Sequence, residues 1–382
     1  MKELSATVEL TRELIARPSV TPDDAGCQEL LIQRLQPAGF AIERMRFGKV
    51  DNFWAIHRGA AGPVVCFAGH TDVVPPGPRE RWSSDPFEPS IRDGLLYGRG
   101  SADMKSGVAA MTTAALEYIG ARPKYPGAIG FVITSDEEGP SVDGTRRVVE
   151  TLRERGQRID YCVVGEPSSQ QAFGDTVRIG RRGSLSGRLT VEGVQGHVAY
   201  PDRALNPIHA VIPAFAELAA RRWDEGNAHF PATSFQVSNV HSGTGAANVI
   251  PGELTAQFNL RWSPVQTLDS LKLTVGAIFD RHGLRHSVDW LEASLPYYTV
   301  PGALTSRVAA AVQDVAGRKP ELSTGGGTSD GRFFGALGAE VVEFGLLNRT
   351  IHQVDECCAV EDIDGLHRVY VDMLRRIFSD SA

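Results

Sequence analysis

The chain has 382 residues, of which 42% are hydrophobic and 22% are charged, and its formal net charge is −7. This composition is that of a globular protein of about two domains, and it excludes disordered and collagen-like chains. Because the sequence contains no cluster of Lys and Arg that could bind phosphates, we expect no nucleic-acid partner. The sequence shows neither an 18-residue apolar run nor a charged and then apolar leader, so we expect a cytoplasmic protein without a membrane partner.

The first part of the chain alternates helical and strand patterns. In chain order it predicts helices at 2–16 and 25–36, strands at 40–46, 52–57 and 63–69, a long Pro- and Gly-rich loop at 74–93, a helix at 104–119, and strands at 129–133 and 160–165. The same pattern resumes near the end of the chain, with helices at 303–317, 330–337 and 361–378 and a strand at 340–345. These segments predict an α/β catalytic domain, formed by 1–181 and 297–382, with a mixed, mostly parallel sheet flanked by helices.

The segment 182–296 has a different pattern. It predicts a strand near 185–191, a helix at 204–220, strands at 233–240 and 253–262, a helix at 267–281 and a last strand at 284–290. This order is the β-α-β-β-α-β order of the split-βαβ unit. We therefore expect an inserted α+β ferredoxin-like domain.

Acidic and histidine side chains follow several of the predicted strands. Asp136, Glu137 and Glu138 follow the strand at 129–133, His70 and Asp72 follow the strand at 63–69, and Glu166 and His352 follow two others. Asp103 lies in a Gly-rich loop just before a helix. Because ligands bind at the carboxyl ends of strands in open α/β sheets, we expect these side chains to meet at one site.

Two histidines and three carboxylates, with no Cys among them, are suitable ligands for zinc, cobalt or manganese in a hydrolytic site. Asp72 lies two residues from His70 on an extended segment, so its carboxylate is placed to orient the imidazole. Glu137 and Glu138 are adjacent and point in different directions. One of them can bind metal while the other faces the substrate as a general base, and the residues alone leave open which is which.

These residues lie in motifs that resemble those of the co-catalytic zinc aminoacylase and carboxypeptidase family. The motifs are GHTDVVPPG (69–77), GRGSADMKSG (98–107), TSDEEGPSVDGT (134–145), GEP (165–167), RRGS (181–184), GHVAYP (196–201), NVIPG (248–252), GGGTSDGRF (325–333) and TIHQVDE (350–356). The resemblance covers nearly the whole chain, including the inserted domain.

The resemblance implies a role for each matching residue. His70 and Glu166 would hold one zinc ion, Glu138 and His352 the other, and Asp103 would bridge the two. Asp72 would orient a ligand, and Glu137 would be the base that activates water. His197 would stabilise the oxyanion across a homodimer interface formed by the inserted domain. Substrate contacts are implied for Arg181, Tyr200, Asn248, Arg261, Thr328 and Asn348.

The implied activity is cleavage of the amide of a small N-acyl amino acid that carries several carboxylates, which Arg pairs in bidentate fashion. Two alternatives remain: a deacylase for another N-acyl amino acid such as N-acetylornithine, and a metal-binding relative without catalysis. Leu347 and Asp355 depart from the usual motif, and neither is an expected ligand. The adjacent Cys357 and Cys358 have no role that the sequence indicates.

Overall fold

The computed structural model describes residues 3–291 and 293–379, and within them the chain divides into two compact units. Unit 1 comprises Met1–Gly180, Tyr298–Ser323 and Ser329–Ala382, and unit 2 comprises Arg181–Tyr297 and Thr324–Thr328. The short loop Thr324–Thr328 belongs to unit 2, although the sequence pattern placed it in the surrounding domain. A separate function for each unit remains a prediction.

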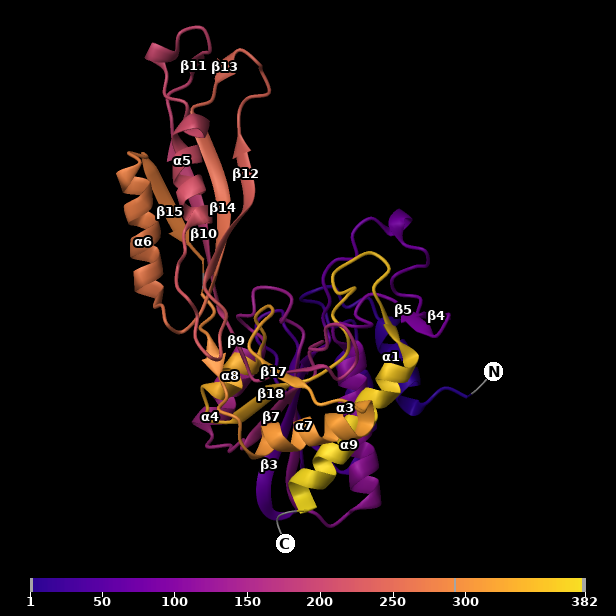
Figure 1. Ribbon diagram of the computed structural model, residues 1–382. Helices are drawn as coiled ribbons and strands as arrows, with labels where there is room; N and C mark the ends of the chain where they lie inside the picture. The colour runs from indigo at the N-terminus through magenta and orange to yellow at the C-terminus, as the bar shows by residue number, and fades with distance from the viewer. Residues whose placement is uncertain (1–2, 292, 380–382) are drawn as a thin grey trace. The chain divides into compact units, whose positions relative to one another are not determined.

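Unit 1 is built on a mixed sheet of eight strands in the order β1-β2-β6-β3-β7-β18-β8-β17. Figure 1 labels β3, β7, β17 and β18 of this sheet. The four central strands β6, β3, β7 and β18 are parallel, whereas β1, β2 and β6 pair antiparallel at one side. The sheet strands are β1 (Ala41–Arg44), β2 (Asn52–Arg58), β3 (Ala60–His70), β6 (Pro126–Thr134), β7 (Tyr161–Val164), β8 (Thr176–Arg178), β17 (Glu321–Ser323) and β18 (Glu340–Glu343). The central parallel strands therefore end at the same edge, and the expected α/β fold class is confirmed.

Helices cover both faces of this sheet. Along β3, Val65 and Phe67 join a buried cluster with residues of α1, α3, α7 and α9, whereas Cys66 between them is buried on the opposite face. On that opposite face α4 contacts β2 and β6, and α8 contacts β7 and β18. The helices are α1 (Ala6–Ile15), α2 (Cys27–Leu35), α3 (Lys105–Ala121), α4 (Thr145–Glu154), α7 (Ala303–Ala316), α8 (Gly331–Gly335) and α9 (Val360–Ser379). Burial on both faces explains why the central strands are apolar without alternation.

The helix α4 and several short strands were not predicted from the sequence. The short strands are β4 (Ser90–Arg92), β5 (Leu95–Tyr97), β9 (Gly180–Arg181), β11 (Gly196–His197), β13 (Val249–Ile250), β16 (Tyr297–Tyr298) and β19 (Cys357–Ala359). Segments of two or three residues are too short to show a period, so their pairing depends on the folded chain.

Unit 2 contains an antiparallel sheet of four strands in the order β12-β14-β10-β15. Its elements are β10 (Gly183–Glu192), α5 (Pro207–Ala220), β12 (Ser234–Ser242), β14 (Glu253–Trp262), α6 (Leu268–Arg281) and β15 (His286–Trp290). One face of the sheet and the two helices share a core in which Leu185, Leu189 and Leu260 are fully buried. The order and pairing confirm the expected ferredoxin-like unit.

Among the described residues, none of the helices is long and apolar enough to cross a membrane.

Candidate metal centre

The candidate ligands lie in unit 1, at the edge where the parallel strands end. His70 is the last residue of β3, Glu138 and Glu166 follow β6 and β7, and His352 lies in the loop after β18. Asp103 lies between β5 and α3, in the loop that begins α3. The topology of the sheet thus brings together side chains that are up to 282 residues apart in the sequence.

One group of ligands consists of His70, Asp103 and Glu166, all of them buried. The Nε2 atom of His70 lies 3.3 Å from Oδ1 of Asp103 and 3.6 Å from Oε1 of Glu166. The Nδ1 atom of His70 donates a hydrogen bond to the backbone carbonyl of Asp72 at 2.8 Å. Because Nδ1 is held by this carbonyl, Nε2 is the nitrogen that faces the two carboxylates.

A second group consists of Asp103, Glu138 and His352. The Nε2 atom of His352 lies 3.0 Å from Oε1 of Glu138 and 3.5 Å from Oδ2 of Asp103. Asp103 therefore presents one carboxylate oxygen to each group. This sharing of one carboxylate by two His and carboxylate groups is the donor arrangement that a pair of metal ions needs.

The metal centre contains more acidic side chains than histidines, and the pKa values of several of these groups are shifted. Burial, together with the nearby charges of Asp103 and Glu137, raises the pKa of Glu166 well above its ordinary value. Burial alone would lower the pKa of His70, but the hydrogen bond to Asp103 and the charge of Glu166 outweigh it, so its pKa lies well above the ordinary value. Hydrogen bonds to Asp103 and Glu138 raise the pKa of His352 to about 10. Carboxylates gathered in this way are stabilised by cations, and the donor set fits metal ions.

Glu137 lies beside this centre but belongs to neither ligand group. Desolvation, together with the negative charges of Asp330, Glu138 and Asp103, raises its pKa well above the ordinary value. Asp136, the first acid of the run, is buried and accepts hydrogen bonds from the amides of Val142 and Asp143 at 3.0 and 3.1 Å. Asp136 therefore fixes the turn that follows the two glutamates.

Asp72 contacts both sides of the centre. Its carboxylate lies 3.6 Å from Nδ1 of His70 and accepts hydrogen bonds from the amides of Glu137 and Glu138 at 3.3 and 3.1 Å. The closer contact with the imidazole is made by the backbone carbonyl of Asp72, not by its carboxylate. The carboxylate therefore positions the Glu137–Glu138 backbone at least as directly as it orients His70.

Glu356 is a supporting residue that the sequence reasoning missed. It is completely buried and accepts hydrogen bonds from the guanidinium of Arg99 at 2.7 Å and from the amides of Gly100, Ala102 and Asp103 at 2.9 to 3.0 Å. These contacts hold the loop that carries Asp103. The sequence shows Glu356 as the last residue of the TIHQVDE motif, but it does not show that this carboxylate pairs with Arg99, which is 257 positions away.

Two of the expected substrate contacts, Arg181 and Arg261, are basic residues of unit 2. Burial and the neighbouring charges of Arg182 and Arg181 lower the pKa of Arg261. The Nη1 atom of Arg261 is buried without a hydrogen bond in the described part of the chain. A guanidinium nitrogen that is buried without an acceptor is suited to an anionic partner.

Of the other expected substrate contacts, Thr328 lies in the loop Thr324–Thr328, in which the carbonyl of Gly325 accepts a hydrogen bond from Arg181 at 3.3 Å. In unit 2, His197 pairs with Val249 next to Asn248, and its ring lies 5.7 Å from that of Tyr200. Thr328 belongs to unit 2, whereas Asn348 lies in unit 1, where its amide donates to the carbonyl of Ser169 at 3.0 Å. Contact of these residues with a substrate remains a prediction.

The model of the peptidase family M20/M25/M40 matches residues 66–376. The chain belongs to this family. Its resemblance to the co-catalytic zinc hydrolases is thereby confirmed, and so is the expected class of chemistry, metal-dependent hydrolysis of an amide bond.

Curated relatives of this M20 chain match over nearly its full length. A succinyl-diaminopimelate desuccinylase of Alkalilimnicola ehrlichii is 58% identical over 374 residues, which cover 98% of this chain and 100% of the relative. A protein of the same name from Thiobacillus denitrificans is 56% identical over 377 residues, which cover 99% of this chain and 96% of the relative.

Solved structures of distant M20 proteins share the fold. The crystal structure of an M20 family metallo-carboxypeptidase from Sulfolobus solfataricus matches with a TM-score of 0.83 at 16% identity and covers 98% of this chain and 99% of its own. A dinuclear metal-binding peptidase of the family from Bacillus subtilis matches with a TM-score of 0.71 at 14% identity, with 97% of each chain covered. At these identities the likeness establishes the fold alone.

Proposed function

We propose that this chain is a di-zinc hydrolase that cleaves N-succinyl-LL-2,6-diaminopimelate to succinate and LL-2,6-diaminopimelate, in the biosynthesis of lysine and peptidoglycan precursors. The observation that carries the proposal is the pair of His and carboxylate groups that share Asp103, with Glu137 beside them. The substrate is inferred from the desuccinylases that are 58% and 56% identical to this chain.

His70 and Glu166 would hold one zinc ion, Glu138 and His352 the other, and Asp103 would contact both. Nitrogen and oxygen donors without Cys also suit cobalt or manganese. When bound, the two ions polarise the amide carbonyl and neutralise the negative charge that develops on its oxygen. Glu356 accepts a hydrogen bond from the amide of Asp103 and so holds the loop that would present this carboxylate to the metal ions.

Glu137 is the general base in this proposal. Its raised pKa brings it closer to neutrality, where a carboxylate accepts a proton from water and later donates it to the leaving amine. Asp72 is a positioning residue, because its carboxylate holds the amides of Glu137 and Glu138. In this arrangement one glutamate of the pair is a ligand and its neighbour moves the proton.

Recognition of a substrate with several carboxylates would fall to Arg181 and Arg261 in unit 2. The charge of Arg181 acts on Arg261, and the buried Nη1 of Arg261 has no hydrogen-bond acceptor in the described part of the chain. A carboxylate guest would supply that acceptor in bidentate geometry. Tyr200, Asn248, Thr328 and Asn348 would contribute further polar contacts.

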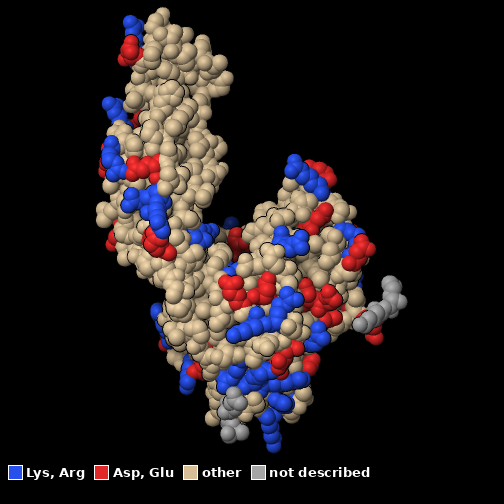
Figure 2. Space-filling model, in the orientation of Figure 1, with Lys and Arg blue, Asp and Glu red and all other residues tan. Residues whose placement is uncertain are grey.

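We also propose a homodimer formed through unit 2. Its strand β12 lies at an edge of the sheet, and its outer half is exposed. Several large apolar side chains of unit 2 are exposed as well, among them Val198 (47%), Ile212 (55%) and Val240 (51%). Figure 2 shows charged side chains on the α6 side of this unit, whereas the β12 side is largely without them in this view. An unpaired edge strand next to apolar surface favours pairing with a second copy.

In such a dimer the partner's His197 would stabilise the oxyanion. The Nδ1 atom of His197 accepts a hydrogen bond from the amide of Ala199 at 3.1 Å, and the side chain is exposed. The acceptor role of Nδ1 places the proton on Nε2, which makes Nε2 a hydrogen-bond donor.

The test is hydrolysis of N-succinyl-LL-2,6-diaminopimelate and of N-acetylornithine by the zinc-loaded protein, with a chelator-treated control. We expect a strong preference for the succinylated substrate and loss of activity on chelation. Activity on the acetylated compound alone would retain the metal chemistry but overturn the proposed substrate. Tight zinc binding without activity on either compound would favour a non-catalytic relative.

A further inference from the structure

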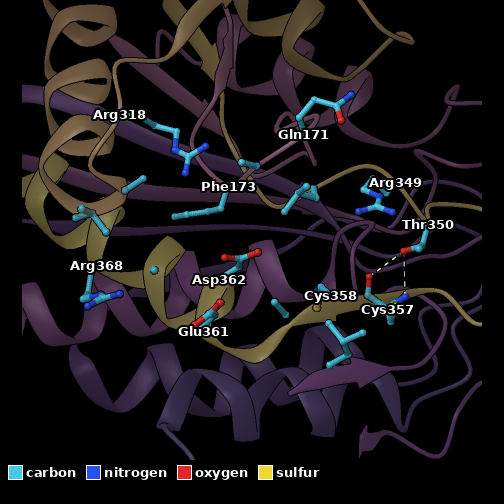
Figure 3. A pocket seen from close by; sticks show the side chains of 17 residues that line it. Gln171, Phe173, Arg318, Arg349, Thr350, Cys357, Cys358, Glu361, Asp362 and Arg368 are labelled. Atoms are coloured by element: carbon cyan, nitrogen blue, oxygen red, sulfur yellow. Dashed lines mark hydrogen bonds between the residues drawn. The ribbon is translucent and has the colours of Figure 1, made fainter. Parts of the chain in front are cut away.

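A cavity of about 750 Å³ opens in unit 1 beside the first turns of α9, and we call it the α9 pocket (Figure 3). Its walls come from the segments 171–173, 315–318, 347–350 and 357–359 and from α9 itself. None of the candidate metal ligands lines it. The α9 pocket is therefore a site apart from the metal centre, although both lie in the same unit.

One wall of the α9 pocket is apolar. Phe173 lies at its centre in Figure 3 and is only partly buried, and Leu95, Val315 and Leu347 are partly buried around it. Partly exposed aromatic and aliphatic side chains in a concave surface gain free energy when an apolar group covers them. The wall thus suits the hydrocarbon part of a small ligand.

Charged groups of both signs surround this wall. The guanidinium groups of Arg318, Arg349 and Arg368 make no ion pair within 4.0 Å in the described part of the chain, and the carboxylates of Glu361 and Asp362 accept no hydrogen bond there. In Figure 3 the side chain of Arg318 points toward Phe173 and Asp362. A rim with both signs of charge is complementary to a zwitterion, whereas a dianion would meet the two carboxylates unfavourably.

The environment of Asp362 agrees with this assignment. Burial and the neighbouring charge of Glu361 raise its pKa to about 6, although Arg318 opposes the shift. A carboxylate that is desolvated next to another carboxylate is stabilised by a cationic group. An ammonium group of the ligand would provide that cation.

The α9 pocket and the metal centre share one segment of chain. Leu347, Thr350 and Cys357 contact the pocket, and His352 lies between the last two. The hydroxyl of Thr350 donates to the carbonyl of Cys357 at 2.8 Å and accepts from its amide at 3.1 Å, which closes the loop 350–357. Glu356 in this loop holds the backbone of Asp103. A ligand against Thr350 and Cys357 therefore contacts the base of a loop that carries metal-centre residues.

We propose that the α9 pocket binds an α-amino acid with an apolar side chain, with its carboxylate at Arg318, its ammonium group at Asp362 and its side chain on Phe173. Binding is coupled to the metal centre through the loop 350–357. The coupling rests on the proposed metal centre, whereas the binding itself does not.

The binding test is calorimetry of the zinc-loaded full chain with L-leucine, 4-methylpentanoate and 3-methylbutylamine, which are the zwitterion and its two singly charged analogues. We expect L-leucine to bind one per chain and at least 10-fold more tightly than either analogue. The variants Asp362→Asn and Arg318→Gln should each weaken L-leucine at least 10-fold. Arg375→Gln, on α9 but outside the pocket, should leave the affinity unchanged.

Equal weakening by all three variants, or equal binding of L-leucine and 4-methylpentanoate, would overturn the zwitterion assignment. L-leucine bound with wild-type affinity by Asp362→Asn and Arg318→Gln would place the ligand elsewhere, for example at the metal centre, and would overturn the pocket. Repeating the titration on metal-free protein tests the coupling, for which we expect at least a 5-fold change in affinity. Equal affinities in the two forms would overturn the coupling without bearing on hydrolysis of the proposed substrate.

Discussion

Glu137 and Glu138 are neighbours in the chain, and their different surroundings give them different roles at the metal centre. Glu138 reaches His352 at 3.0 Å, whereas Glu137 lies outside both ligand groups. We expect Glu137→Gln to lower kcat about 10²- to 10⁴-fold, because the amide cannot accept a proton from water. Zinc content, measured by elemental analysis, should remain that of the wild type.

The matched control for this prediction is Glu138→Gln, which should reduce zinc content as well as activity. Retention of wild-type turnover by Glu137→Gln would contradict the assignment of Glu137 as the base. A parallel loss of zinc in both variants would instead indicate that Glu137 is itself a ligand.

Glu356 and Arg99 form a buried ion pair that supports Asp103. We expect Glu356→Gln to lower the free energy of unfolding by about 3 kcal/mol, because Arg99 would remain buried without its counter-charge. Since the Asp103 loop would also lose its anchor, zinc affinity should fall about 10- to 100-fold. Denaturant unfolding of the metal-free protein and zinc titration measure the two effects separately.

Asp355 provides the control for Glu356. It is adjacent to Glu356 in sequence. Among the described residues, its carboxylate accepts hydrogen bonds only from the amide and the hydroxyl of the exposed Ser83. Asp355→Asn should therefore change the free energy of unfolding by less than about 1 kcal/mol. If Asp355→Asn were as damaging as Glu356→Gln, a general distortion of this loop would explain the loss better than the missing ion pair.

At the scale of elements, the close approach of α3 to the end of β7 helps to fix the metal centre. A Cβ atom on Gly107 of α3 would lie 2.3 Å from the carbonyl oxygen of Gly165, which immediately precedes Glu166. Gly107→Ala must displace backbone on one side, so we expect a loss of about 1 to 3 kcal/mol in the free energy of unfolding. Thermal unfolding of the metal-free protein is the measurement.

Gly120 lies on the same helix and gives a control of opposite sign. It is exposed, and a Cβ atom there would meet nothing within 4 Å. Gly120→Ala should therefore raise the stability by about 0.5 to 1 kcal/mol through helix propensity. Destabilisation by both substitutions would show that the effect at Gly107 does not come from its contact with Gly165.

Most of the elements that the sequence predicted show an apolar period, although α4 was missed despite Val148, Val149 and Leu152 at helical spacing. The helix α9 and the strands β3 and β6 have apolar patterns over nine or more residues, and the carboxylates and histidines at the strand ends were found with them. The short strands β5 and β19, which pair in the sheet next to the Asp103 loop, have no such pattern. The role of Glu356 depends on that long-range pairing, so it was visible only in the folded chain.

At the scale of the whole molecule, the candidate ligands lie in unit 1 and His197 lies in unit 2. If the partner's His197 completes each site of a homodimer, two inactive variants can complement one another. A subunit with His197→Ala retains Glu137, and a subunit with Glu137→Gln retains His197. Hybrid dimers of the two would contain one complete site.

We therefore expect a 1:1 mixture of His197→Ala and Glu137→Gln proteins to regain about a quarter of wild-type activity after complete subunit exchange, because half of the dimers are hybrids and each has one complete site of two. Native mass spectrometry of size-tagged subunits establishes the exchange. A mixture of His70→Ala and Glu137→Gln is the control, because both substitutions lie in the same metal centre and no hybrid contains a complete site. Proven exchange without recovery in the first mixture would mean that His197 acts within its own subunit or not at all.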